Sequence, residues 1–375
     1  MVCKTFDKKI AREPCPKETM DIEAILDERS RYVDAIIERY IPRAFDEQSL
    51  RNAFGPPRYE YNVEAANRSM AEPIWDLLDR GGKRWRPFLF LLICETLGRD
   101  PAEFADFSVL IELVHNGSLM VDDIEDSSDL RRGQPCVHKK FGIDIAINAA
   151  NAMYYLPLLA FLKNRAGVEA ETMLRAYEAY SQELINIHLG QGMDISWHRG
   201  MANADNISED QYLQMCALKT GTLARLSARL AAIFCDAEEA LTAKLGKLAE
   251  CLGIGFQIQD DVLNLTAQSG KNQFVEEYVG SDIIEGKRTI MVIHALRQSS
   301  RAKRLLELLN MHTRDRKLIG EAIQILEDSD SIEYARGRAR EIVTEAWENV
   351  RDDLAASTAK ETLANFILFA VERDY

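Results

Sequence analysis

Apolar residues recur along most of this chain at intervals of three and four residues, the spacing of one face of an α-helix. The first such run starts at Ile22, continues through Val33 to Ile37, and is ended by Pro42. Further helices are predicted from Pro87 onward and near residues 64–80, 103–129, 143–165, 169–196, 208–235, 237–266, 284–298, 301–310, 314–328, 331–353 and 358–373. No alternating, β-branched run is long enough to predict a sheet. The pattern predicts an all-α fold.

The breaks in this pattern predict how the chain is organised. Residues 43–62 have the composition of a loop, with Gly55-Pro56-Pro57 at its centre. No Pro- or Gly-rich linker and no low-complexity tract follows residue 70. We therefore expect an N-terminal extension over residues 1–62, made of one helix and a loop, and a single all-helical domain over residues 63–375.

Composition limits the kinds of molecule that this protein is expected to bind and the compartment in which it is expected to work. The formal net charge of −14 argues against nucleic acid. The seven cysteines show no CxxC or metal-ligand spacing, and the N-terminus has no apolar segment typical of a signal peptide. No uninterrupted apolar stretch looks long enough to span a membrane. These features predict a cytoplasmic protein.

Two aspartate-rich segments lie within predicted helices, each after a long apolar run. They are Asp122-Asp123-Ile124-Glu125-Asp126 and Asp260-Asp261-Val262-Leu263-Asn264. Side chains at i and i+4 share a helix face about 5–6 Å apart, so the first and last residues of each segment are spaced to bind one cation. Oxygen-only ligands suit Mg²⁺, which often bridges carboxylates to substrate phosphates. One segment alone is more often a solvated acidic face; two of them, with the basic motifs below, favour a magnesium–diphosphate clamp.

Basic residues gather at four places along the chain, namely Gly81-Gly82-Lys83-Arg84-Trp85-Arg86-Pro87, Arg131-Arg132-Gly133, Lys219-Thr220 and Gly286-Lys287-Arg288-Thr289. Arg131-Arg132-Gly133 is predicted to close the helix of the first Asp motif. His115 lies about two turns before Asp122, on the same face. A glycine cap with basic residues at a helix C-terminus would explain one or two of these cations. The full set is better explained by binding of phosphate oxygens.

Taken together, these motifs resemble the trans-isoprenyl diphosphate synthases, the polyprenyl synthetase family. The resemblance covers nearly all of residues 64–373, and the motifs occur in the family's order. Besides the segments above, it rests on Leu113-Val114-His115, Gly190-Gln191-Gly192-Met193-Asp194, Phe256-Gln257-Ile258-Gln259 and Asp282 with Glu285. Within the family, the stretches Leu113–Gly133 and Asp260–Leu265 look most like geranylgeranyl diphosphate synthases. The resemblance implies a helical bundle around a central cavity, usually as a homodimer or larger homo-oligomer.

The resemblance also implies a role for each motif. Asp122 and Asp126 would hold two Mg²⁺ ions, and Asp123 belongs with them as a catalytic carboxylate. Asp260, helped by Asp261 and Asn264, would hold a third ion. The allylic diphosphate would be bound by Arg131, Lys219, Thr220, Gln257 and Lys287. Isopentenyl diphosphate would be bound by Lys83, Arg86, His115 and Arg132. Gln191 and Asp194 would support these residues.

Three departures from the family pattern qualify this assignment. Asn264 stands where many members have Asp, so Asp260 would carry more of its metal site. Glu277 lies where a lysine often contacts the allylic diphosphate, and Lys271 is a candidate replacement. The long N-terminal extension has no counterpart that we can use.

Product length is expected to depend on an apolar tunnel beside the first Asp motif. Short-chain members often carry an aromatic residue four or five positions before the first Asp, where this chain has Ser118 and Gly117. Val114 and then Ile111 would line the tunnel beyond them. Its next candidate floor is Tyr154 or Tyr155, although both tyrosines are equally well explained as core or interface residues. We expect geranylgeranyl diphosphate, with a longer product or farnesyl diphosphate as alternatives.

Other functions explain the sequence less well. A terpene cyclase also ionises an allylic diphosphate at an Asp motif, but it has no need of a second diphosphate site. A non-catalytic synthase subunit usually loses an Asp-rich motif, and both are present here. A purely structural helical protein leaves the motifs unexplained.

Overall fold

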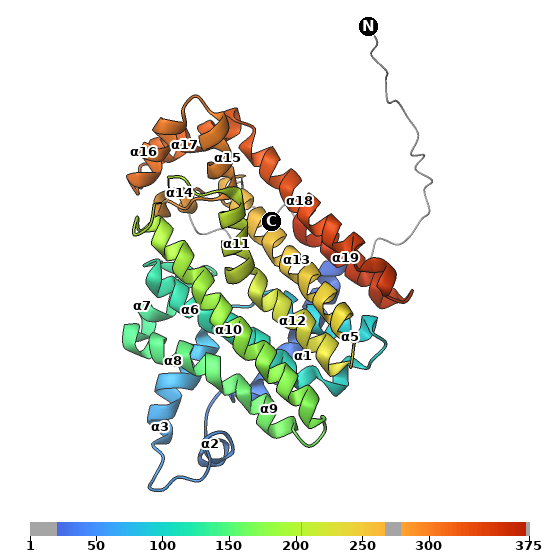
Figure 1. The fold of residues 1–375 in the computed structure, drawn as a ribbon. Coiled ribbons are helices and arrows are strands. Elements are labelled where there is room, and N and C mark those ends of the chain that lie inside the picture. Colours follow the sequence, from blue (N-terminus) through green and yellow to red (C-terminus); the bar gives the residue numbers. More distant parts are fainter. Residues whose placement is uncertain (1–20, 204, 267–278, 373–375) are drawn as a thin grey trace.

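The computed structural model describes residues 21–203, 205–266 and 279–372 and is almost entirely helical (Figure 1). The helices of the N-terminal half are α1 (Ile22–Tyr40), α2 (Glu47–Phe54), α3 (Val63–Ala66), α4 (Glu72–Leu78), α5 (Trp85–Thr96), α6 (Val109–Glu125), α7 (Val137–Phe141), α8 (Ile143–Tyr155), α9 (Leu159–Asn164) and α10 (Ala170–His198). Those that follow are α11 (Glu209–Lys219), α12 (Gly221–Phe234), α13 (Glu239–Thr266), α14 (Ser281–Glu285), α15 (Ile290–Gln298), α16 (Ala302–Asn310), α17 (Arg316–Asp328), α18 (Ser331–Glu348) and α19 (Thr358–Glu372). The predicted all-α fold is confirmed.

Helix α12 lies at the centre of the bundle. It packs against α5, α10 and α13, and α13 in turn packs against α18. Gly221 and Gly253 make the α12–α13 crossing close, since a Cβ on Gly253 would lie 2.6 Å from the Cα of Gly221. This crossing brings the start of α12 next to the second half of α13, the two segments that carry Thr220 and the second Asp motif.

Several local predictions differ from the structure. The predicted helix 208–235 is broken at Thr220 into α11 and α12. The predicted loop 43–62 contains α2, which begins with a capping box formed by Asp46 and Ser49. The predicted helix 103–129 is three elements: two short 3₁₀ turns, Pro101–Glu103 and Ala105–Ser108, precede α6.

The end of α6 also differs from the prediction. This helix ends at Glu125, and a short antiparallel hairpin follows, formed by β1 (Leu130–Arg131) and β2 (Gln134–Pro135). Arg131 therefore lies on a strand, and Arg132 has a left-handed φ of 53° in the turn. Two-residue strands are too short to show an alternating pattern, so they could not be predicted from the sequence.

Helix α1 packs directly on the bundle. It contacts α5, α6 and α19, and Leu26, Val33 and Ile37 on its inner face are fully buried. The predicted boundary between residues 62 and 63 stays a prediction.

One segment of the described chain, Ile143–Asn164, is apolar and long enough by composition to cross a membrane, which the sequence had not predicted. It consists of α8, a 3₁₀ turn over Leu156–Leu158 and α9. Of an apolar stretch of 18 residues within it, 56% is buried inside the protein. A core helix of a bundle has the same properties, so the segment gives no clear membrane span.

Candidate active site

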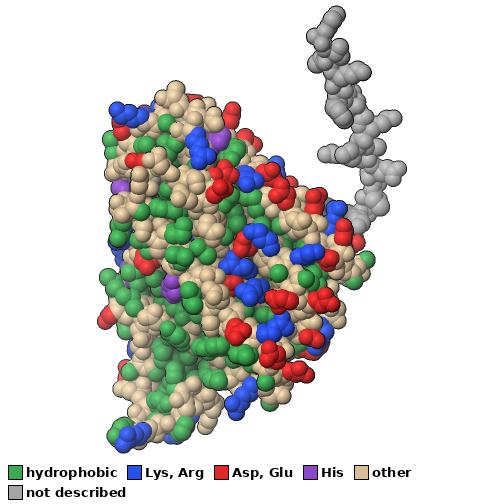
Figure 2. Space-filling view, viewed as in Figure 1, with side chains coloured by type: hydrophobic (Ala, Val, Ile, Leu, Met, Phe, Trp, Pro, Cys, Tyr) green, Lys and Arg blue, Asp and Glu red, His purple; other side chains and the backbone are tan. Residues whose placement is uncertain are grey.

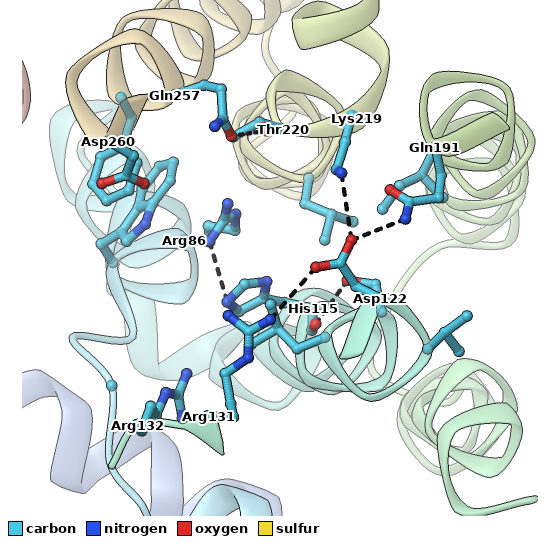
Figure 3. A pocket seen from close by; sticks show the side chains of 18 of the residues that line it. Arg86, His115, Asp122, Arg131, Arg132, Gln191, Lys219, Thr220, Gln257 and Asp260 are labelled. Atoms are coloured by element: carbon cyan, nitrogen blue, oxygen red, sulfur yellow. Dashed lines mark hydrogen bonds and ion pairs between the residues drawn. The ribbon is translucent and has the colours of Figure 1, made fainter. Parts of the chain in front are cut away.

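One cavity of about 690 Å³ contains most of the residues singled out from the sequence (Figure 3). Its walls come from α6, α8, α10, α13, α14 with the loop that follows it, the α11–α12 junction, the hairpin, and the loop before α5 with the first turn of α5. The sequence-predicted residues that line it are Lys83, Arg86, His115, Ser118, Asp122, Arg131, Arg132, Tyr154, Gln191, Lys219, Thr220, Gln257, Asp260, Asp261, Asn264, Asp282 and Lys287. Residues that are far apart in the sequence therefore converge on one site.

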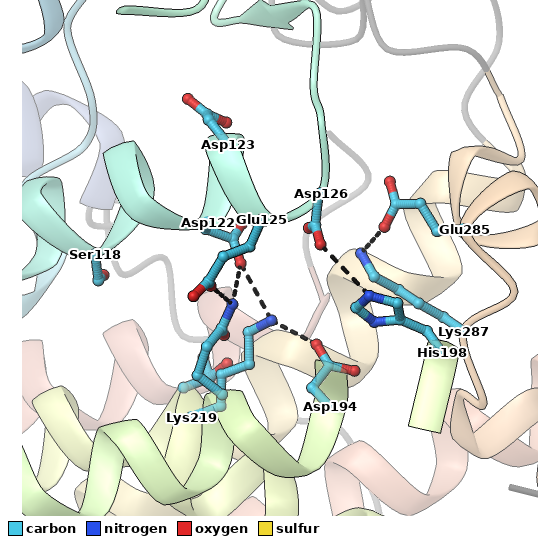
Figure 4. A network of polar contacts seen from close by, with 12 residues as sticks. Ser118, Asp122, Asp123, Glu125, Asp126, Asp194, His198, Lys219, Glu285 and Lys287 are labelled. Atoms are coloured by element: carbon cyan, nitrogen blue, oxygen red, sulfur yellow. Dashed lines mark hydrogen bonds and ion pairs between the residues drawn. The ribbon is translucent and has the colours of Figure 1, made fainter. Parts of the chain in front are cut away.

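Asp122 is the centre of a polar network on one side of this cavity. Its Oδ1 accepts hydrogen bonds from Gln191 Nε2 at 2.9 Å and Lys219 Nζ at 3.3 Å, and its Oδ2 lies 3.5 Å from Arg131. Burial raises the pKa of the Asp122 carboxyl, but Lys219 and Arg131 outweigh burial, and the net pKa is lowered. Lys219 also donates to Asp194 at 2.5 Å (Figure 4).

A glycine makes this network possible. A Cβ on Gly190 would lie 2.4 Å from the backbone nitrogen of Lys219 and 2.5 Å from the carbonyl carbon of Leu218. Only a residue without a side chain allows α10 and α11 to come this close. The contact places Gln191 and Lys219 on opposite helices within reach of Asp122.

The other aspartates of the first motif point elsewhere. Asp126 lies at the end of α6, nearly buried, 3.9 Å from His198 Nε2. Burial and the charge of Asp122 raise the pKa of Asp126 to about 7. Asp123 turns away from Asp122 in Figure 4, and its Oδ1 accepts a hydrogen bond from Arg131 Nε at 2.8 Å. The buried side chain of Asp123 thus anchors Arg131, and its role as a catalytic carboxylate stays a prediction.

The second motif occupies the opposite wall, where Figure 3 shows Asp260 across the cavity from Asp122. Asp261 is 5% exposed and accepts hydrogen bonds from Tyr212 Oη and Gln257 Nε2, both at 2.8 Å. Burial and the charge of Asp282 raise the pKa of Asp261 to about 8. Asp261 is thus bound to protein donors through both oxygens.

Asn264 ties two helices together. Its Nδ2 donates to Ser281 Oγ at 2.6 Å, and its Oδ1 accepts from the backbone N–H of Asp282 at 3.2 Å. These contacts position the start of α14, which carries Asp282 and leads to Lys287. In this arrangement the amide of Asn264 holds α14, and its role as a metal ligand stays a prediction.

The predicted isopentenyl diphosphate residues form a basic wall. Arg86 lies 3.4 Å from His115 Nε2, and Arg132 donates to the carbonyl of Gly81. A Cβ on Gly82 would lie 3.0 Å from the Arg132 guanidinium, so glycine makes room for that contact. Burial and the Arg86 charge lower the pKa of His115 well below its usual value, which makes this imidazole neutral at pH 7.

Lys287 and Thr220, which were predicted to bind the allylic diphosphate, also line the cavity. Lys287 pairs with Glu285 at 2.6 Å and Asp282 at 3.3 Å. Thr220 donates to Gln257 Oε1 at 2.7 Å and thereby links α13 to the α11–α12 junction. Lys271 and Glu277 lie outside the described residues.

The tunnel residues separate into two groups. Ser118 and Tyr154 line the cavity. Gly117 and Tyr155 do not line it: a Cβ on Gly117 would lie 3.0 Å from the Ala150 carbonyl oxygen on α8, and Tyr155 is 69% exposed, so their role in product length stays a prediction. Val114 is likewise fully buried and does not line the cavity.

Sequence reasoning missed two residues at this end of the cavity. His188 lies with its ring 5.8 Å from that of Tyr154, and Asn151 lies nearby on α8. His188 precedes Gln191 by about one helical turn, which would have indicated that it faces the same cavity.

The donor chemistry of the site suits magnesium. Asp122, Asp126 and Asp260 provide the oxygen atoms that Mg²⁺ prefers. In the described part of the chain, however, no group of three or more His, Cys, Asp or Glu side chains is gathered closely enough to hold a metal alone.

Comparison with known proteins identifies the family. The sequence profile of the polyprenyl synthetase family matches residues 67–326. This chain belongs to the polyprenyl synthetase family. The predicted family, and with it the assignment as a trans-prenyltransferase enzyme, is confirmed.

Named relatives and solved structures agree with this assignment. The synthetase is 34% identical to the geranylgeranyl pyrophosphate synthase of Geoglobus acetivorans over 299 residues, which cover 80% of this chain and 89% of the relative. It is 33% identical, with the same coverage, to the short chain isoprenyl diphosphate synthase of Methanothermobacter thermautotrophicus. The crystal structure of geranylgeranyl pyrophosphate synthetase from Pyrococcus horikoshii superposes with a TM-score of 0.80 at 29% identity, covering 95% of this chain and 100% of that one.

Proposed function

We propose that this polyprenyl synthetase joins isopentenyl diphosphate head-to-tail to an allylic diphosphate and makes geranylgeranyl diphosphate as its main product. The observation that carries the proposal is one cavity with the two Asp-motif helices on opposite walls (Figure 3) and, among its lining residues, cations of both predicted diphosphate sites. Two anion sites are what a condensation of two diphosphates requires.

One set of residues would bind the allylic diphosphate and its Mg²⁺ ions. Lys219, Arg131 and Lys287 bind the allylic diphosphate beside Asp122. Bound Mg²⁺, three ions in our proposal, would be held by Asp122, Asp126 and Asp260 and would neutralise the diphosphate as it leaves.

The basic wall binds the second substrate. Lys83, Arg86, Arg132 and neutral His115 hold isopentenyl diphosphate with its double bond toward the allylic carbon. The allylic C–O bond breaks, the double bond attacks the resulting cation to form the new C–C bond, and the departing diphosphate takes the proton. No side chain is needed as a base.

The second cation set favours a synthase over a terpene cyclase, and the presence of both Asp motifs favours a catalytic chain over an inactive subunit. For product length, the small Ser118 lines the same cavity as Tyr154 and His188, which we propose as its floor. Geranylgeranyl synthases among the relatives support this length; a geranylfarnesyl diphosphate synthase of Natronomonas pharaonis, 32% identical, makes a longer product the alternative.

We also propose that the enzyme is a homodimer that works in the cytoplasm. Figure 2 shows hydrophobic side chains gathered over the lower left of the molecule, where Figure 1 places α8 and α10. The exposed apolar side chains of α8, α9 and α10 are Ile143, Ile147, Tyr155, Leu162, Leu174, Tyr177, Ile185 and Leu189. Such a surface marks an interface. Light scattering after gel filtration should give twice the chain mass; a monomer would contradict the dimer.

Incubation of the purified protein with Mg²⁺, farnesyl diphosphate and labelled isopentenyl diphosphate tests the reaction. Labelled geranylgeranyl diphosphate is expected. Cyclic hydrocarbon without elongation would favour the cyclase, and no product with any allylic substrate would contradict the proposal.

A further inference from the structure

Arg84 lies in the middle of the basic loop, yet none of the roles assigned above needs it. Its side chain is 2% exposed and makes three hydrogen bonds to three helices. Nε donates to Asp34 Oδ1 on α1 at 3.0 Å, Nη1 to Glu112 Oε1 on α6 at 2.9 Å, and Nη2 to the carbonyl oxygen of Leu78 on α4 at 2.9 Å. The planar guanidinium thus has a fixed partner on each side.

The backbone at Arg84 shows what this clamp holds. Its φ of 46° and ψ of 34° are left-handed, a conformation that costs a residue with a side chain about 1 kcal/mol or more. The kink separates Lys83 from Arg86, which stands in the first turn of α5. The directions in which Lys83 and Arg86 project therefore depend on the Arg84 kink, and the kink depends on its three partners.

Helix α1 also reaches the loop at a second point. Glu23 precedes Asp34 by about three turns, so both carboxylates lie on the same helix face. Glu23 Oε1 is 3.6 Å from Lys83 Nζ. Asp34 thus contacts Arg84, the residue that shapes the loop. Glu23 contacts Lys83, which in the proposed function binds isopentenyl diphosphate.

We propose that helix α1, which lies outside the family-matched segment, is part of the isopentenyl diphosphate site through two acidic residues with opposite effects. Asp34 is a positioning residue: through Arg84 it holds Lys83 and Arg86 in the geometry that binds the diphosphate. Glu23 competes with the diphosphate for Lys83. This inference rests on the proposed function, since it presumes that Lys83 and Arg86 bind isopentenyl diphosphate.

Two neutral variants in the full-length chain test the two roles. Asp34→Asn removes the charged acceptor of Arg84 but keeps the side-chain size, and the carboxylate is 41% exposed, so the fold should survive. Its KM for isopentenyl diphosphate should rise about three- to tenfold, as expected for loss of a partly exposed charged contact. Its kcat and its KM for the allylic substrate should stay near wild type. Asp34→Glu should restore most of the affinity.

Glu23→Gln should act in the opposite direction and lower the KM for isopentenyl diphosphate about two- to threefold, because the diphosphate no longer displaces a carboxylate from Lys83. Asp27→Asn and Glu28→Gln are the matched controls, since both residues are exposed on α1. Neither control should change any kinetic constant. Loosening of α1 in general would raise KM in all four variants and cannot produce opposite signs.

The outcomes separate this inference from the proposed function. A wild-type protein that makes no prenyl product would overturn the proposed function. If the wild type is active, either of two results for Asp34→Asn would overturn the inference. The first is an unchanged KM for isopentenyl diphosphate. The second is an equal rise in KM for both substrates. A rise in KM for Glu23→Gln would overturn its competing role.

Discussion

Replacing Gly190 by Ala should separate the two helices that hold Asp122. The new Cβ would lie 2.4 Å from the backbone nitrogen of Lys219, whereas ordinary contacts begin at 3.4 Å. Because the opposing atoms belong to the backbone, α10 and α11 must move apart by about 1 Å, at a cost of about 1–3 kcal/mol in unfolding free energy.

That displacement reaches the proposed chemistry directly. Lys219 Nζ lies 3.3 Å from Asp122 Oδ1, so a shift of this size breaks the contact and moves the ammonium away from the allylic diphosphate. A misplacement of about 1 Å lowers turnover about 100-fold. We expect that loss in kcat for Gly190→Ala.

Gly192→Ala is the matched control. It makes the same change on the same helix, but its Cβ would meet nothing within 4 Å. It should keep wild-type turnover and gain up to about 1 kcal/mol of stability from helix propensity. Turnover is measured at saturating Mg²⁺ and substrates, and thermal unfolding verifies that both variants are folded. A folded Gly190→Ala enzyme with the turnover of Gly192→Ala would refute the reasoning.

Four further predictions test other parts of the site. Asp122→Ala should remove most activity at saturating Mg²⁺ with little change in helix content or melting temperature; near-normal turnover would exclude it as a metal ligand. Arg86→Ala should raise the KM for isopentenyl diphosphate by about one to two decades and affect the allylic substrate much less, as steady-state kinetics with each substrate varied will show. Ser118→Phe should shorten the product toward farnesyl diphosphate without loss of ionisation, and an unchanged product on chromatography would place the tunnel elsewhere. Burial, with the charge of a neighbouring Asp, raises the pKa of Asp126 to about 7 and of Asp261 to about 8, so their contribution to the stability of the metal-free protein is complete below the unfolded pKa of about 4 and is lost as pH rises through these values. The melting temperature in chelator should therefore fall between about pH 4 and pH 8, and stabilisation by Mg²⁺ should grow over the same range; a chelated protein that melts at a higher temperature at pH 8 than at pH 5 would contradict these pKa shifts.

Local sequence patterns were enough to predict the fold, the family and most of the residues that line the cavity. Helical periodicity gave the all-α fold, and the two Asp motifs with their basic partners gave the family and most of the cavity lining. What the sequence could not give depends on contacts between distant segments. Asp123 turns toward Arg131 because a short hairpin folds back there, and Gly117 faces α8 because two helices cross at that point. The clamp on Arg84 needs three helices and has no local signature.

Product analysis of the purified wild-type enzyme tests the central claim most directly. The protein is incubated with Mg²⁺, labelled isopentenyl diphosphate and either dimethylallyl, geranyl or farnesyl diphosphate, and the products are separated by chain length. We expect linear prenyl diphosphates that end mainly at geranylgeranyl diphosphate and disappear when Mg²⁺ is chelated. Failure to extend any of the three allylic substrates, or equal product with and without chelator, would contradict it.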